Sequence, residues 1–107
     1  MSEEKLAEFL KNGEDWGKVR TSVPGVYILK MPASKNFPAR LSVEINPVDA
    51  SGTPTKKRGL IIREISEFEE FKEIMSNDKI ESLFDMLEEV NPPSAKKSKS
   101  RDDYIDI

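Results

Sequence analysis

The 107-residue chain has a composition that excludes several classes of protein. It contains no His, Cys or Gln, so a Ser-His-Asp triad, a thiol nucleophile, a thiolate zinc site and a disulfide are all excluded. Apolar residues make up 36% of the chain and charged residues 35%, which is enough for one modest hydrophobic core in a surface-rich protein.

The chain also lacks the features of a membrane or secreted protein. Its longest apolar runs, residues 26–29 and 60–62, are far too short to span a bilayer. The first ten residues are acidic where a signal peptide is basic, so we expect a cytoplasmic protein without membrane partners. The absence of Cys and Gln beside abundant Lys and Glu favours a hyperthermophilic source.

The net charge of −3 conceals a strong segregation of charge along the chain. Residues 18–63 carry nine Lys and Arg against two acidic residues, a net +7. Residues 64–90 carry two Lys against ten acidic residues, a net −8. We therefore expect an anionic partner to bind the central basic block, although the sequence pI is near 5.1.

The first elements in chain order are a helix and a hairpin. Ser2 is placed to cap a short helix that ends at residues 12–13. The apolar residues of that helix follow a helical spacing, namely Leu6, Phe9 and Leu10. Residues 19–23 and 26–31 are rich in β-formers and flank Pro24-Gly25, a dipeptide that suits the centre of a type II turn.

Two further strands are predicted in the centre of the chain. Residues 33–38 form a loop, and Arg40–Asn46 then alternates between apolar and polar side chains, which predicts a half-buried strand. Residues 47–57 form a polar turn region, and residues 59–65 form a strand apolar enough to be central.

The last third of the chain is predicted to be helical. Ser66 and Glu69 match a capping box at the start of one helix. Asn77 and Asp78 end that helix and cap a second one, which stops at residues 91–93, Asn-Pro-Pro.

This order of elements predicts an α+β fold: an antiparallel sheet of about four strands with helices packed on one face. We expect one domain over residues 1–91. Residues 92–107 contain few apolar groups and are predicted to form a disordered C-terminal tail.

The basic block is the strongest candidate for a functional site. Its basic residues are Lys18, Arg20, Lys30, Lys35, Arg40, Lys56, Lys57, Arg58 and Arg63. Aromatic residues are interleaved with them, and basic groups with aromatic faces are typical of single-stranded nucleic-acid binding. Phe37 is the best stacking candidate because its loop is hard to bury. Tyr27 is a second candidate, but Tyr27 and Trp16 both also suit the core. The alternative is a solvated charged face.

Lys56-Lys57-Arg58-Gly59 is the densest basic cluster in that block. At a turn that enters a strand it is suited to clamping phosphates, with Gly59 allowing close approach. The alternative is a charged hairpin end that keeps the edge of a sheet soluble.

Catalysis is not expected, and neither is a cofactor or a metal. The carboxylates in and beside the basic block are Glu44, Asp49 and Glu64, and none stands in a metal-dependent nuclease pattern. The five Gly are scattered singly, so no glycine-rich phosphate loop exists. The acidic helices are expected to be solvated and to repel nucleic acid.

The tail ends in an acidic and apolar tip, residues 102–107, after a basic segment. This tip resembles the C-terminal tips of single-stranded-DNA-binding proteins. It is suited to docking on a protein partner or to folding back on the basic block, or it is simply an unstructured end.

The central segments also resemble a known family. The runs Arg40–Asp49 and Gly52–Arg63, followed by two helices to Asn91, resemble the ThermoDBP-related proteins of hyperthermophilic archaea. The resemblance covers about residues 14–91 and implies an antiparallel sheet with helices, oligomerisation and single-stranded nucleic acid as the ligand. It implies phosphate contacts by Arg40, Lys56, Lys57, Arg58 and Arg63. The chain departs from the founding member because it lacks a long C-terminal zipper.

The sequence thus predicts a non-catalytic, sequence-tolerant protein that binds single-stranded DNA or RNA as a homodimer or a higher homo-oligomer, associated with the nucleoid. The alternative is a protein-interaction adaptor or transcriptional cofactor that acts through its acidic helices and its C-terminal tip.

Overall fold

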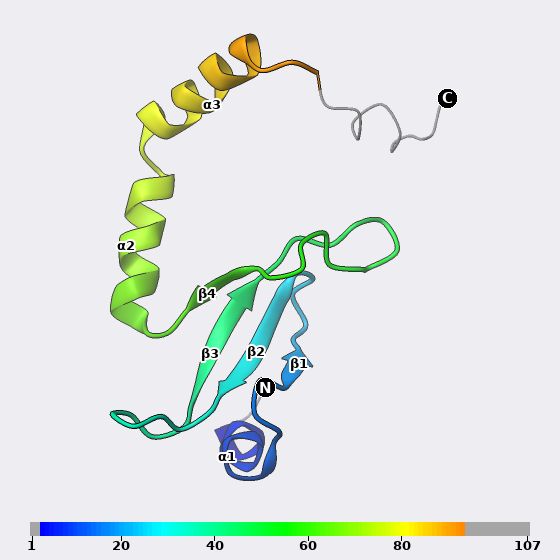
Figure 1. Ribbon diagram of the computed structural model, residues 1–107, viewed down its shortest axis with the longest axis vertical. Helices are drawn as coiled ribbons and strands as arrows, with labels where there is room; N and C mark the ends of the chain where they lie inside the picture. The colour runs from blue at the N-terminus through cyan, green and yellow to red at the C-terminus, as the bar shows by residue number, and fades with distance from the viewer. Residues whose placement is uncertain (1–2, 94–107) are drawn as a thin grey trace. The chain divides into compact units, whose positions relative to one another are not determined.

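The computed structural model describes residues 3–93. Within them the chain forms three helices and a four-stranded antiparallel sheet, so the predicted α+β class and order of elements are confirmed (Figure 1). The elements are α1 (Glu3–Asn12), β1 (Lys18–Arg20), β2 (Val26–Met31), β3 (Arg40–Ile45), β4 (Leu60–Ile62), α2 (Ile65–Met75) and α3 (Asp78–Val90). The predicted disorder of the tail and the roles assigned to its tip concern residues outside the described part beyond residue 93.

The chain divides into two compact units, with the division between Glu70 and Phe71. The first unit holds α1, the whole sheet and the beginning of α2, and the second holds the rest of α2 and α3. The sequence predicts one domain over residues 1–91 and contains no linker of Gly, Pro or Ser at this division. All of the basic block lies in the first unit.

The strands lie in the order β1-β2-β3-β4, and each pairs with its neighbour along the chain. Val19, Ile28, Val43 and Ile62 stand opposite one another across the four strands. Because side chains in one such row point to the same side of a sheet, this row defines an apolar face. The alternate residues define a second face, which we call the polar face.

The turn between β1 and β2 is the predicted type II turn. Gly25 has φ +86°, a value that a side chain disfavours, and the Val26 N–H donates to the carbonyl of Val23 at 3.1 Å. The strand before it is shorter than predicted and ends at Arg20. After it, the Thr21 N–H and hydroxyl both donate to the carbonyl of Val26, at 3.3 and 2.8 Å.

The apolar face of the first unit is largely uncovered. A hollow of about 560 Å³ lies over it, lined by sheet residues such as Val26, Ile28 and Val43 and by Leu6 of α1 and Phe68 of α2. Among the described residues only three apolar ones are buried, namely Tyr27, Leu29 and Ile62. This unit therefore retains apolar surface of the kind that marks an interaction site.

The helix ends show which capping predictions were right. Asn77 caps α3 as predicted, accepting a hydrogen bond from the Lys79 N–H at 2.8 Å, and the helix ends at Val90 before Asn91. The capping box of α2 was assigned to the wrong residues: the helix begins at Ile65, and Glu67 instead of Glu69 reaches back to the Arg63 N–H, at 2.7 Å. None of the helices in the described part of the chain has the length and apolar character needed to cross a membrane.

Candidate nucleic-acid interface

The polar face of the sheet carries the first basic residues of the predicted site. Arg20 and Tyr27 share a row with Glu44, and Lys18 stands opposite Leu29 in the next row. Arg20 is exposed, whereas Tyr27 is only 8% exposed and the Lys18 ammonium lies 5.6 Å from the centre of its ring. Tyr27 is therefore part of the core under this face and offers no open ring for stacking.

Lys30 is separated from the other basic residues. It stands opposite Leu41 on the apolar face, one residue out of phase with Leu29 and the polar face. Its side chain is 7% exposed, and its ammonium donates to the carbonyl oxygen of Gly13 at 2.9 Å. The two-residue period of a strand thus removes Lys30 from the basic surface, where the sequence places it.

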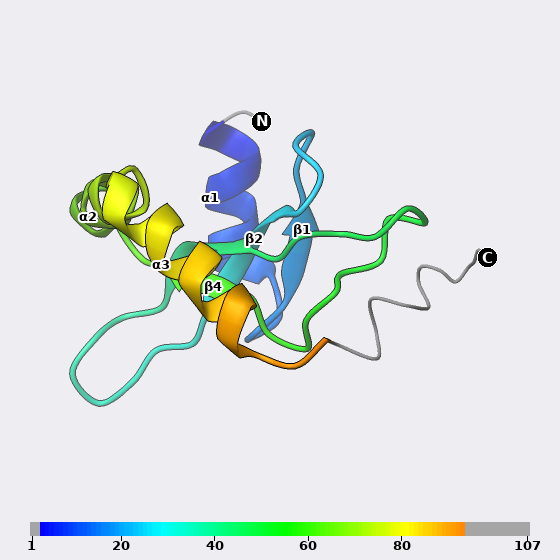
Figure 2. The same ribbon diagram turned by 90° about the horizontal axis from the view of Figure 1, so that it is seen from above.

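The loops on either side of β3 supply most of the remaining basic residues. These loops, residues 32–39 and 46–59, extend away from the sheet (Figure 2). Lys35 and Phe37 lie exposed in the first loop, and Phe37 is 63% exposed. Lys56, Lys57 and Arg58 are exposed in the second loop.

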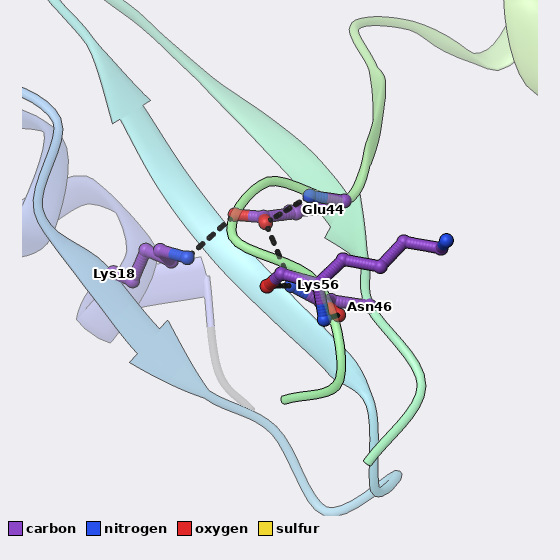
Figure 3. Close-up of polar contacts among 5 residues, drawn as sticks. Lys18, Glu44, Asn46 and Lys56 are labelled. Carbon is purple, nitrogen blue, oxygen red and sulfur yellow. Dashed lines mark hydrogen bonds and ion pairs between the residues drawn. The ribbon is translucent and has the colours of Figure 1, made fainter. Parts of the chain in front are cut away.

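The second loop is fastened to β3 through the side chain of Asn46, which is fully buried. The Asn46 amide nitrogen donates to the carbonyl of Lys56 at 2.8 Å, and the Lys56 N–H donates to the Asn46 side-chain oxygen at 3.1 Å. This pair imitates a backbone ladder, so it holds the main chain of Lys56 while its side chain extends outward (Figure 3).

Glu44 is a second anchor for the same loop, with a side chain that is 3% exposed. Its carboxylate accepts the Gly59 N–H at 2.7 Å and the Lys18 ammonium at 3.0 Å, and the Asn46 amide lies 3.5 Å away (Figure 3). Burial raises the pKa of Glu44, but the hydrogen bond from Gly59 and the ion pair with Lys18 outweigh it, so the pKa lies below its ordinary value. Glu44 is therefore a charged structural group, and it neutralises part of the charge of Lys18.

Gly59 has a packing role that the sequence does not predict. A Cβ placed on it would collide with the carbonyl oxygen of Ile45 and lie 2.8 Å from the Cβ of Asn46. Its small size thus lets the loop of residues 46–59 approach β3, and this packing by itself requires a glycine.

We expect the stabilising effect of Glu44 to depend on pH. A carboxyl group with a lowered folded-state pKa stabilises the fold above its unfolded pKa of about 4.3, and this contribution is lost as the pH falls through the folded-state value. Urea unfolding should therefore show a stability deficit of Glu44→Gln that is full at pH 7 and shrinks by pH 3. The exposed Glu88→Gln is the control, with no deficit at either pH. A deficit of Glu44→Gln that is equal at both values would contradict this role.

Arg40 and Arg63 form the other basic part of the interface. Arg40 donates from its guanidinium to the carbonyl oxygen of Arg63 at 3.2 Å, which joins the start of β3 to the end of β4. The Arg63 guanidinium lies 3.1 Å from the Glu67 carboxylate, and its side chain is still 59% exposed. Hydrogen bonds from the backbone and the side chain of Arg63 lower the pKa of Glu67, which keeps this ion pair charged.

Two hollows lie side by side on this surface, and Trp16 lines both of them. The first, of about 270 Å³, is also lined by Lys18, Lys57 and Arg58. The second, of about 260 Å³, is also lined by Phe37, Arg40 and Arg63. The two hollows thus bring together Trp16, Phe37 and five of the predicted basic residues, and they leave Lys35 and Arg20 outside.

Trp16 is the residue of this surface that the sequence does not select. Trp16 is 57% exposed, although tryptophan commonly suits a core. The sequence contains one clue: Trp16 stands between Asp15 and Gly17, in a connection that belongs to no amphipathic pattern. An aromatic side chain in such a position has no obvious face on which to be buried.

Within residues 3–93 no group of three or more acidic side chains is placed to hold a metal ion. Comparisons of the chain with models of protein families, with curated proteins and with solved structures give no match. The resemblance to the ThermoDBP-related proteins remains a prediction from the sequence.

Proposed function

We propose that this protein is a non-catalytic, sequence-tolerant binder of single-stranded DNA or RNA. The observation that carries the proposal is the pairing of exposed aromatic rings with basic side chains in the two hollows of the polar face. Basic groups neutralise phosphates, and exposed rings stack on bases of any identity. In a cell this function implies association with the nucleoid.

The distribution of charge supports binding on this face. The buried acidic group that lines the first hollow, Glu44, already forms an ion pair with Lys18 and accepts a hydrogen bond from the Gly59 N–H. The acidic residues of the chain are concentrated after residue 63, where residues 64–90 carry a net −8. A polyanion is therefore attracted to the block of residues 18–63 and repelled by the helices that follow.

Salt dependence tests the electrostatic part of this proposal. The five phosphate contacts implied by the family resemblance should give a slope of log K against log salt of about −3.5 for a single strand. Fluorescence anisotropy of a labelled oligonucleotide, measured from 50 to 300 mM salt, gives this slope. Binding without salt dependence would remove the basic residues from the mechanism.

We further propose that the protein acts as a homo-oligomer, in which a second copy covers the uncovered apolar surface. Each unit by itself leaves an apolar surface open. In the first unit it is the apolar face, with Val43 at 38% exposure, and in the second it is the stripe of α3, where Leu83, Phe84 and Leu87 are 42–58% exposed. The oppositely charged segments, residues 18–63 and 64–90, also favour association between copies.

The alternative function, a protein-interaction adaptor, is supported by α3 alone. This helix combines an exposed apolar stripe with five acidic residues, Asp78, Glu81, Asp85, Glu88 and Glu89. Such a helix is suited to a hydrophobic groove with a basic rim. It does not account for the exposed rings of Trp16 and Phe37, so we prefer nucleic-acid binding.

A further inference from the structure

The backbone of Trp16 is in an unusual conformation. Its φ is +65°, and it is the one non-glycine residue with a positive φ among residues 3–93. Bulky residues are rarely found in this region because the side chain crowds the backbone. A residue held there needs surrounding structure that fixes it, and such residues gather at binding sites.

The structure around Trp16 supplies that constraint. The Trp16 N–H donates to the carbonyl of Lys30 at 2.7 Å, and the Lys30 N–H donates to the carbonyl of Gly17 at 3.0 Å. The Gly17 N–H donates to the carbonyl of Glu14 at 2.9 Å. The chain is thus tied to β2 on both sides of Trp16, while Trp16 itself remains 57% exposed. These hydrogen bonds fix the backbone of Trp16 and leave the residue exposed.

The position of the ring explains what this conformation achieves. Trp16 forms a wall common to both hollows, and Phe37, which is 63% exposed, lines the second one. Besides Trp16, the first hollow has Lys57 and Arg58 together with Lys18, which is already paired with Glu44. The second hollow has Arg40 and Arg63. The surface therefore repeats one arrangement, an exposed aromatic side chain beside at least two cations, at two neighbouring positions.

We propose that Trp16 and Phe37 are two consecutive base-stacking positions, each with its own pair of phosphate-binding side chains. This inference rests on the proposed function and deepens it by naming the ligand as two adjacent unpaired nucleotides. The volumes of the hollows, about 270 and 260 Å³, lie just below the range of about 300–1,000 Å³ for pockets that hold whole small ligands. They suit one planar base each. A base inside a duplex has both faces covered by its neighbours, so it cannot stack on either ring.

The arrangement also predicts how the ligand is chosen. Every base has a π-face, so stacking discriminates poorly among bases but strongly between a base and its absence. A strand of sugar and phosphate without bases keeps the ionic contacts and loses both stacking contacts. Binding by charge alone needs only the phosphates, so it would not distinguish an abasic strand from a normal one.

The intrinsic fluorescence of Trp16 tests the inference directly, because the chain contains one Trp. Oligo-dT should quench the emission of the wild-type full chain at 50 mM salt, with the same midpoint as its anisotropy signal. An abasic strand of equal length, which loses both stacking contacts, should bind at least about 30-fold more weakly and leave the emission unchanged. Quenching by oligo-dT and the abasic strand alike would overturn the inference.

Variants of Phe37 test the second position without altering the fluorophore. Phe37→Leu keeps apolar bulk but lacks a π-face, so its affinity for oligo-dT should fall by about 5- to 100-fold, whereas Phe37→Tyr should bind like the wild type. Phe71→Leu is the matched control, since Phe71 is half-buried on α2 and lines neither hollow, and its affinity should not change.

Different results would overturn the stacking positions and the proposed nucleic-acid binding. If oligo-dT binds with a steep salt dependence but Trp16 emission and the Phe37→Leu affinity do not change, the stacking positions are overturned and the proposed function stands. If neither strand binds at 50 mM salt, both are overturned.

Discussion

Replacing Lys56, Lys57 and Arg58 together with Ala will weaken binding of a single strand by at least about 20-fold at 50 mM salt. Three lost phosphate contacts reduce the slope of log K against log salt by about 2.1. Over the fourfold change from 200 to 50 mM salt, this smaller slope makes the variant lose about 20-fold in affinity relative to the wild type. The variant should still fold, because Asn46 holds the backbone of Lys56, not its side chain, and Glu44 holds the backbone of Gly59.

Anisotropy titrations at 50 and 200 mM salt measure this loss, and thermal unfolding checks the fold. The matched control is the double variant Lys72→Ala and Lys79→Ala, which removes the two basic residues of residues 64–90 and should not weaken binding. If the triple variant had the affinity and the salt slope of the wild type, the loop of residues 46–59 would be excluded from the interface.

The second large effect concerns assembly. Val43→Glu will place a carboxylate in the central row of the apolar face. If a second copy covers this face, the charge is buried without a partner, which costs about 3–5 kcal/mol and raises the dissociation constant more than about 100-fold. The wild-type chain should therefore sediment as a multiple of 12.2 kDa, and the variant as a monomer at the same concentration.

Val23→Glu is the control for this substitution, since Val23 is 55% exposed and precedes the turn between β1 and β2. It should assemble like the wild type. A wild-type chain that sediments at 12.2 kDa at 50 μM would contradict the oligomer. So would a Val43→Glu variant that assembles as the wild type does.

Regular patterns made much of the fold predictable. The alternation of Arg40–Ile45 has the two-residue period of a strand with one apolar face, and the structure shows that strand as β3. Pro24-Gly25 predicted a turn because few residues adopt a positive φ, and Asn77 predicted a helix start because its side chain accepts a backbone N–H.

The parts that depend on pairing between distant residues were not predictable. Lys30 is buried because it lies on the apolar face of the sheet and because its ammonium reaches the carbonyl of Gly13, 17 residues earlier in the chain. Glu44 reads as a solvent-facing residue of an alternating strand, and only its contact with Gly59, 15 residues later, makes it a buried anchor. The capping of α2 shifted because Glu67 found the N–H of Arg63.

The candidate site was predictable in its chemistry and not in its geometry. Charge counting located the basic block, and its loops do carry exposed Phe37, Lys57 and Arg58. Trp16 was left open because an exposed tryptophan with φ +65° follows from hydrogen bonds to β2, which no local pattern encodes.

The central claim is that this surface binds single-stranded nucleic acid through phosphates and unpaired bases. Competition between a labelled single strand and unlabelled strands of the same sequence, single or duplex, tests it most directly at 50 mM salt. We expect the single strand to compete at least about 10-fold better than the duplex, because only unpaired bases reach Trp16 and Phe37. Equal competition by both, or no binding of the labelled strand, would contradict the claim.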